Sequence, residues 1–208
     1  MQILLVVATE GEALFFGALG LEVAISGIGA VNAALTTLQV AGSSRPDLII
    51  NAGIAGAFPG QGLQIGDVAL SNTITSASLG AEDRDGGFLN LQKLGFPLHG
   101  DLHNRLPAWE GATDLARRLG LKAGEMLTLE TVTGTQQTLD KLQHLYPAAL
   151  TEGMEGAGVA LAGLRLEVPV LEVRGISNMV GPRDRESWNI PLALKACRSA
   201  LERMMAEV

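Results

Sequence analysis

The stretch V-P-V-L-E-V-R-G-I-S-N, residues 168–178, decides the fold of this chain. A buried run, Val168–Ile176, ends on the polar pair Ser177-Asn178. A strand that turns polar at its carboxyl end is typical of α/β enzymes, which bind ligands beyond the carboxyl ends of their strands. Upstream, Glu155 in G-M-E-G-A begins an apolar helical pattern. Glu155, Ser177 and Asn178 are therefore candidate site residues.

Similar runs predict the rest of the sheet. Nearly continuous apolar segments, typical of strands that are covered on both faces, occur at Ile3–Ala8, Glu22–Ser26, Leu48–Asn51, Asp67–Ser71, Met126–Thr128 and Val168–Ser177. Helical patterns lie between or after them at Ala30–Ala41, Glu110–Leu119, Gln136–Leu145, Glu155–Arg165 and Ser187–Met205. This alternation predicts a three-layer α/β/α architecture with a mainly parallel or mixed sheet. The Gly- and Pro-rich span Ser78–Pro107 is expected to be a long connection.

Composition narrows the class of protein. A chain of 208 residues with 47% hydrophobic residues suits one domain, 1–208, with a sizeable core. The formal net charge of −7 and the scattered basic residues argue against a nucleic-acid surface. No window approaches ~18 uninterrupted apolar residues, and Met1–Ala8 lacks the features of a signal peptide. We therefore expect no membrane partner and a cytoplasmic location. The single cysteine, Cys197, is expected to be a buried structural thiol.

Two glycine-rich segments end predicted strands. Gly27-Ile28-Gly29 opens a helix, but the third glycine and the acidic residue of a dinucleotide fingerprint are missing, so we expect no such cofactor. A turn that brings backbone amides near a ligand and a purely structural turn both remain open. Asn51–Phe58 ends a strand in small residues, which allow close approach of a flat ligand or simply form the exit of the strand.

Acidic residues offer the clearest chemistry. Glu10 and Glu12 directly follow the first predicted strand, where solvated residues at a helix N-terminus are one explanation. The other explanation is that these acids and Glu155 belong to one binding site. One carboxylate can accept a proton from water, and another can accept hydrogen bonds from the cis-diol of a ribose. The three histidines have no partner at metal-binding spacing, so no metal is expected.

With these residues in view, the chain resembles the purine nucleoside phosphorylase and nucleosidase superfamily. The motifs I-L-L-V-V-A-T-E-G-E, S-G-I-G-A-V-N-A-A, N-A-G-I-A-G-A, I-G-D-V, T-V-T-G-T, G-M-E-G-A and V-R-G-I-S-N occur in the family's order and spacing over most of the chain. Within it the chain is similar to methylthioadenosine-type nucleosidases, and most similar to the futalosine hydrolases, which release hypoxanthine in menaquinone biosynthesis. The resemblance implies a partly barrel-like mixed sheet and a homodimer or larger oligomer.

The resemblance also implies residue roles. Glu12 matches the acid that activates the attacking water, and Glu155 matches the acid that holds the ribose hydroxyls. Met154 is then expected beneath the sugar. The backbone at Thr131-Val132 matches the segment that binds the purine edge, and Ala55-Gly56 matches the wall beside the base.

Asn178 departs from the adenine-specific nucleosidases, which carry Asp at this position. An asparagine is no strong general acid, but its amide NH₂ donates to N7 or O6, both acceptors in a 6-oxopurine. The sequence therefore favours hypoxanthine over adenine as the leaving base. The alternatives are a methylthioadenosine/S-adenosylhomocysteine-type nucleosidase and a non-catalytic nucleoside-binding member of the fold.

The nucleophile and the 5′ side complete the predicted site. No arginine precedes Arg45, and acids follow the first strand, so water is favoured over phosphate as the nucleophile. An aryl carboxylate on the 5′ side of futalosine needs a partner. Arg183 or Arg185 with Trp188 are candidates, as are residues of the Ser78–Pro107 span; alternatively the arginines cap the last helix or pair with neighbouring acids.

Overall fold

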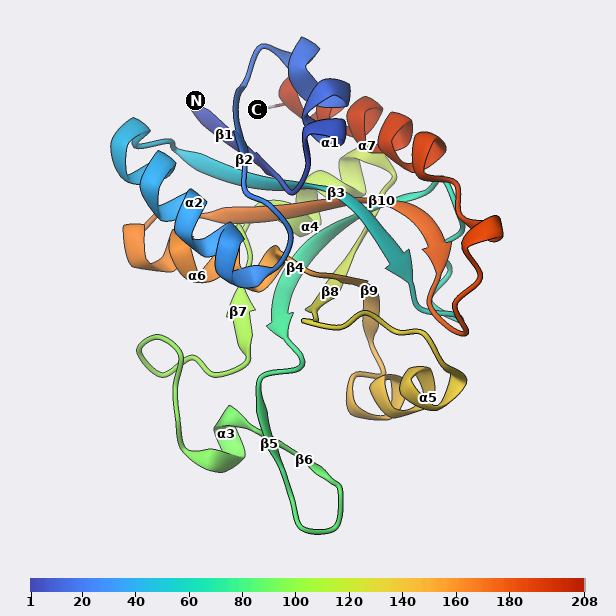
Figure 1. Cartoon of the computed structure of the whole chain (residues 1–208). Helices are drawn as coiled ribbons and strands as arrows, with labels where there is room; N and C mark the ends of the chain where they lie inside the picture. Colours follow the sequence, from blue (N-terminus) through green and yellow to red (C-terminus); the bar gives the residue numbers. More distant parts are fainter. Residues whose placement is uncertain (208) are drawn as a thin grey trace.

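The computed structural model describes residues 1–207, which form ten strands and seven α-helices (Figure 1). The strands are β1 (Ile3–Val7), β2 (Glu22–Ile25), β3 (Leu48–Ala57), β4 (Val68–Ser76), β5 (Gly80–Glu82), β6 (Phe88–Asn90), β7 (Arg105–Pro107), β8 (Lys122–Thr128), β9 (Ala149–Gly153) and β10 (Val170–Met179). The helices are α1 (Glu10–Phe16), α2 (Ala30–Ser44), α3 (Leu91–Leu94), α4 (Ala112–Leu119), α5 (Gln136–Leu145), α6 (Gly156–Leu166) and α7 (Ile190–Met205).

One mixed sheet dominates the structure. Strands β10, β4, β8, β9 and β3 follow one another, and β3 also pairs with β10, so these five strands close into a ring. β1 and β2 extend the sheet from β3 in parallel, while β7 pairs with β4. The predicted mixed, partly barrel-like α/β fold is therefore confirmed.

Helices cover both faces of this sheet, as the apolar strands require. In β1, Leu5 packs with helices α1, α4 and α7, whereas Leu4 packs with α2 and α6 on the other face. Figure 1 shows α1 and α7 together on one side and α2 beside α6 on the other. Because successive strand side chains point to opposite faces, a run that is apolar at every position is what two helical layers demand.

Several boundaries differ from the sequence expectation. β3 continues six residues past Asn51 because its small residues are flanked by β10 and β9. The last helix begins at Ile190, not Ser187, since Asn189 caps it by accepting from the amide of Leu192. β9 was not expected, because its only large apolar residue is Leu150. The span Ser78–Pro107 is likewise more than a connection: it contains the β5–β6 hairpin, α3 and β7.

Two further observations concern the chain as a whole. Cys197 is fully buried in α7, and burial raises the pKa of its thiol to about 12, in accord with a structural role. Among the described residues, no helix combines the length and the hydropathy needed to cross a bilayer.

Candidate active site

A cavity of about 440 Å³ opens where β3, β9 and β10 end. This volume falls within the range that binding sites for small molecules usually have, roughly 300–1,000 Å³. Of the predicted site residues, the cavity is lined by Glu12, Ala55, Gly56, Val132, Met154, Glu155, Ser177, Asn178, Arg183 and Trp188. Thr131 is exposed and lies outside this lining, whereas its neighbours Val132 and Thr133 lie within it.

Glu12 lies in the first turn of α1, and most of its side chain is buried. Its Oε2 accepts from the amide of Ala8, and from the amide and the hydroxyl of Thr9, at 3.0–3.1 Å. Thr9 Oγ1 in turn accepts from the amide of Glu12, which completes a capping box. These bonds fix the carboxylate by one oxygen. Oε1 makes no protein hydrogen bond among the described residues and is available to a ligand.

Glu155 stands at the start of α6 and is buried. Its Oε1 accepts from the amide of Gly29 at 3.0 Å, so the glycine turn presents a backbone amide to this carboxylate. The turn is possible because Gly29 has a φ of 95°, a conformation that other residues rarely adopt. The turn therefore holds the carboxylate of Glu155 through a backbone amide, and its contact with a ligand stays a prediction.

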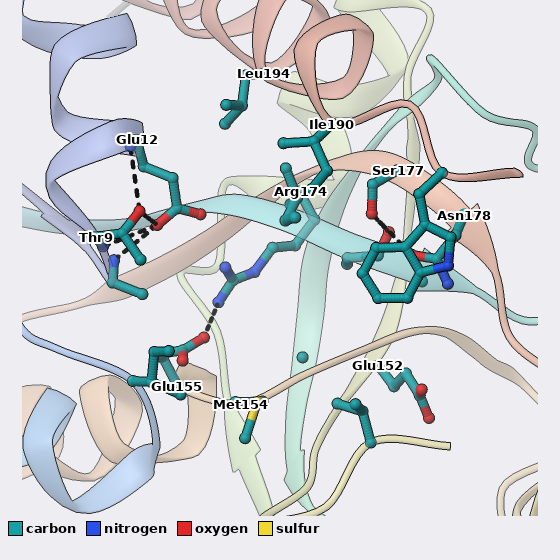
Figure 2. A pocket seen from close by; sticks show the side chains of 18 of the residues that line it. Thr9, Glu12, Glu152, Met154, Glu155, Arg174, Ser177, Asn178, Ile190 and Leu194 are labelled. Carbon is teal, nitrogen blue, oxygen red and sulfur yellow. Dashed lines mark hydrogen bonds and ion pairs between the residues drawn. The ribbon is translucent and has the colours of Figure 1, made fainter. Parts of the chain in front are cut away.

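Arg174 lies between the two carboxylates and was not predicted from the sequence. The side chain is fully buried between Glu12 and Glu155 in Figure 2, and its Nη2 lies 3.8 Å from Glu155 Oε2. Its Nε donates to Glu172 Oε1 at 2.7 Å, and Nη2 donates to Asn51 Oδ1. Burial alone lowers the pKa of Arg174, but Glu172 and Glu155 outweigh it and raise the pKa above its ordinary value. The guanidinium therefore remains charged.

Gly53 of β3 leaves room for this arrangement. A Cβ at that position would lie 2.5 Å from Glu12 Oε1 and 2.7 Å from Arg174 Nη1. Real Cβ atoms essentially never come so close to other atoms. Because Gly53 has no side chain, Glu12 and Arg174 can both lie against the backbone of β3 at this position.

At the other end of the cavity, Ser177 orients Asn178. Ser177 lies at an irregularity in the β3–β10 pairing, between Ile176 and Asn178. Its hydroxyl donates to Asn178 Oδ1 at 2.8 Å, and Asn178 Nδ2 donates to the carbonyl of Met179 at 3.1 Å. One of the two amide N–H groups of Asn178 thus remains free to donate to a ligand.

Glu152, near the carboxyl end of β9, is a second residue of the site that was not predicted from the sequence. It is 5% exposed and lines the cavity. Its Oε1 accepts from the amide of Thr133 at 2.9 Å, and its Oε2 accepts from the Thr133 hydroxyl at 2.6 Å. Burial raises the pKa of Glu152, and the hydrogen bonds from Thr133 oppose this rise.

Arg183 and Trp188 form the rim of the cavity. The Arg183 guanidinium lies 5.1 Å from the centre of the Trp188 ring, and that of Arg185 lies 6.0 Å from it. No carboxylate among the described residues lies within 4.0 Å of either guanidinium. The alternative pairing of these arginines with Asp184 or Glu186 is therefore not seen, and Arg185 does not line the cavity.

For Arg174 a signal was present in the sequence. Glu172 and Arg174 interrupt the apolar run of β10, and charged residues in a buried strand need partners. Their spacing of two places them on the same face of the strand. Glu152 had no comparable signal, because β9 itself was not recognised. Among the described residues, no group of three potential ligands could hold a metal ion.

The fold and the cavity together define an α/β protein with a nucleoside-sized site at one end of a closed mixed sheet. Comparison with known families gives the same class: residues 5–208 match the phosphorylase superfamily, and the chain belongs to this family.

Individual relatives show which members of the family are similar to this chain. The futalosine hydrolase of Streptomyces coelicolor is 40% identical over 190 residues, which cover 89% of this chain and 78% of that protein. The 5′-methylthioadenosine/S-adenosylhomocysteine nucleosidase of Maridesulfovibrio salexigens is 30% identical, with 77% and 70% covered. The solved structure of the nucleosidase of that name from Helicobacter pylori, with butyl-thio-DADMe-Immucillin-A, has a TM-score of 0.85 at 19% identity and covers 100% of this chain and 99% of that chain. The similarity to futalosine hydrolases predicted from the sequence is thus confirmed.

Proposed function

We propose that this protein hydrolyses the N-glycosidic bond of futalosine and releases hypoxanthine and dehypoxanthine futalosine. The observation that carries the proposal is the meeting of Glu12, Glu155 and Asn178 in one cavity, although they come from three distant segments (Figure 2). The similarity to futalosine hydrolases at 36–40% identity supports this substrate. The reaction proceeds through a ribosyl transition state with oxocarbenium character.

Glu12 activates the water. The three hydrogen bonds to its Oε2 hold the carboxylate in place, and Oε1 accepts the proton of a water that attacks the sugar. The same charge repels phosphate, which makes water the nucleophile.

Glu155 holds the ribose. With Gly29 on one oxygen, its remaining lone pairs accept from the 2′ and 3′ hydroxyls. Its negative charge also stabilises positive charge on the sugar in the transition state. Met154 lines the cavity beside it and packs beneath the sugar.

Asn178 serves the leaving base. Because the Ser177 hydroxyl donates to Oδ1, the NH₂ group of Asn178 is the part available to the purine. It donates to N7 or O6 as negative charge develops on the base, with Ala55 and Gly56 alongside. The amide of Asn178 thus stabilises the base as it leaves as an anion; the anion takes up a proton from solvent to give hypoxanthine, and Glu12 returns its proton to solvent.

The rim binds the 5′ tail. Arg183 has no carboxylate partner within the described chain and stacks on Trp188, so its charge is available to the aryl carboxylate of futalosine. Arg183→Ala is expected to reduce selectivity for futalosine over inosine about tenfold, the effect of losing roughly one charge-assisted hydrogen bond. Arg185→Ala is the matched control, since Arg185 lies outside the cavity. Equal selectivity of Arg183→Ala and wild type would contradict this role.

A cytoplasmic homodimer, or larger homo-oligomer, completes the proposal; the location rests on the sequence alone. Ile28, Val31, Leu35 and Leu38 are exposed at spacings of three and four residues, and the last three lie on α2. Such spacing gives one apolar helix face, which suits a second copy of this chain. No residue of the span Ser78–Pro107 lines the cavity of the single chain.

Base release from futalosine, inosine and methylthioadenosine, with and without phosphate, tests the function. The proposal requires phosphate-independent release of hypoxanthine from futalosine. A preference for methylthioadenosine would instead favour the methylthioadenosine-type alternative, and no turnover of any of the three would favour a non-catalytic binding protein. A strict need for phosphate would contradict hydrolysis.

A further inference from the structure

Glu152 occupies a defined position relative to the base site. Glu152 pairs with Gly56 across β9 and β3, and Gly56 pairs with Asn178 across β3 and β10. The two polar residues therefore lie at the same level of the sheet, one on either side of a residue without a side chain. A Cβ on Gly56 would lie 3.1 Å from Asn178 Nδ2. A flat ring over Gly56 would have an amide on one side and a carboxylate on the other.

The partners of Glu152 fix its chemical character. Both of its protein partners are donors on Thr133, so both carboxylate oxygens act as acceptors. Each oxygen has a further lone pair. No Lys or Arg among the described residues lies within 4.0 Å of Glu152. A buried carboxylate without a cation is costly unless donors surround it, and burial raises the pKa of Glu152 accordingly. The site therefore has an unused acceptor that a ligand donor would satisfy.

A 6-oxopurine has the matching donor. Hypoxanthine carries N1–H next to O6, whereas adenine has an unprotonated N1 that is itself an acceptor. Asn178 supplies a donor for N7 or O6, and because its Oδ1 already accepts from Ser177, the carboxylate of Glu152 is the better acceptor for N1–H. We propose that Glu152 accepts the N1–H of the hypoxanthine base and, together with Asn178, determines selectivity for 6-oxopurines. This inference rests on the proposed function, because it concerns the base end of the same site.

A purely structural role makes a different prediction. If Glu152 only anchored the segment around Thr133 to β9, its loss would weaken the binding of every base by a similar factor. A role in recognition changes the ratio between bases. Adenine would encounter lone-pair repulsion from the carboxylate of the wild type, and the amide NH₂ of Glu152→Gln would relieve it by donating to N1.

Free-base binding to the full chain separates these roles. Dissociation constants of hypoxanthine and adenine are measured by calorimetry for wild type, Glu152→Gln and Glu130→Gln, an exposed control in the same segment. We expect Glu152→Gln to lower the preference for hypoxanthine over adenine about 10- to 100-fold, the effect of losing a hydrogen bond to a charged group. Glu130→Gln should leave the preference unchanged. An unchanged preference in Glu152→Gln would overturn the inference.

If Glu152→Gln fails to fold, the same inference can be tested on the wild-type protein with a modified base. 1-Methylhypoxanthine lacks the N1–H donor, and wild type should bind it at least about tenfold more weakly than hypoxanthine. Equal affinity for the two bases would overturn the inference. Turnover of futalosine by the same wild-type preparation reports on the proposed function separately, so failure of one is distinguishable from failure of the other.

Discussion

Three buried carboxylates lie in one cavity, and their partners give each a different chemistry. Glu12 is held by one oxygen and leaves the other free. Glu155 is held by the amide of Gly29 and faces the charged Arg174. Glu152 is bonded only to Thr133 and lies on the side of the cavity away from Glu12 and Glu155 in Figure 2. At the residue scale, function depends less on the presence of acids than on which lone pairs the protein leaves unused.

Asn178 provides the prediction at this scale. Asn178→Asp places a carboxylate at N7, where it favours a protonated purine and accepts from a 6-amino group. The ratio of kcat/KM for methylthioadenosine to that for futalosine should rise by about 10- to 100-fold, within the ~10⁴-fold that a polar mismatch can impose. Asn189→Asp is the matched control, because Asn189 caps α7 outside the cavity. An unchanged ratio would remove Asn178 from base selection.

At the element scale, β3 and β10 place most of the site. Their parallel pairing runs from Val170 opposite Ile49 to Met179 opposite Ala57, so Gly53 and Arg174, and later Gly56 and Asn178, are direct neighbours. Small residues at the end of β3 allow charged side chains of β10 and α1 to lie against its backbone. The site side chains therefore come close together because β3 pairs with β10 in this register and has small residues there.

Gly53→Ala tests this arrangement. The added methyl group would lie within 2.7 Å of both Glu12 and Arg174, and both are held by hydrogen bonds that resist displacement. We expect kcat for futalosine to fall at least about tenfold, with a loss of about 1–3 kcal/mol in the free energy of unfolding. Gly17→Ala is the control, since nothing lies within 4 Å of its Cβ position. Kinetics and denaturant unfolding measure both quantities; normal kcat in Gly53→Ala would contradict the packing argument.

The elements also show what the sequence could predict. The long apolar runs of β1 and β10 identified buried strands, and the helical patterns between the runs located most helices, because these signals are local. β9 escaped notice, since its stability comes from pairing with β3 and β8 on either side. Glu12 and Glu155 stood out as acids beside predicted elements, and the family resemblance gave them roles. Arg174 had a local signal in the charged residues of β10, whereas Glu152 depends on the pairing of β9 with its neighbours, which no local pattern encodes.

At the scale of the whole molecule, the exposed apolar face of α2 is the main feature not explained by the single chain. If this face is the contact with a second copy, Leu35→Asp should convert a dimer to a monomer, because a charge would be buried at the contact. Light scattering coupled to gel filtration measures the mass. Gln137→Asp on the exposed side of α5 should not change it. A wild type that is monomeric at micromolar concentration would contradict the proposed assembly.

The central claim also concerns the whole molecule, because the closed sheet brings α1 to the same cavity as β9 and β10. There Glu12 is proposed to activate the water that cleaves futalosine. The direct test is kcat for hypoxanthine release from futalosine by Glu12→Gln, beside Glu10→Gln on the same helix turn, where Glu10 is exposed and lies outside the cavity. We predict a fall of about 10²–10⁴-fold for Glu12→Gln, the usual contribution of a general base, with unchanged circular dichroism and near-normal turnover for Glu10→Gln. Near-normal turnover by Glu12→Gln would contradict the account.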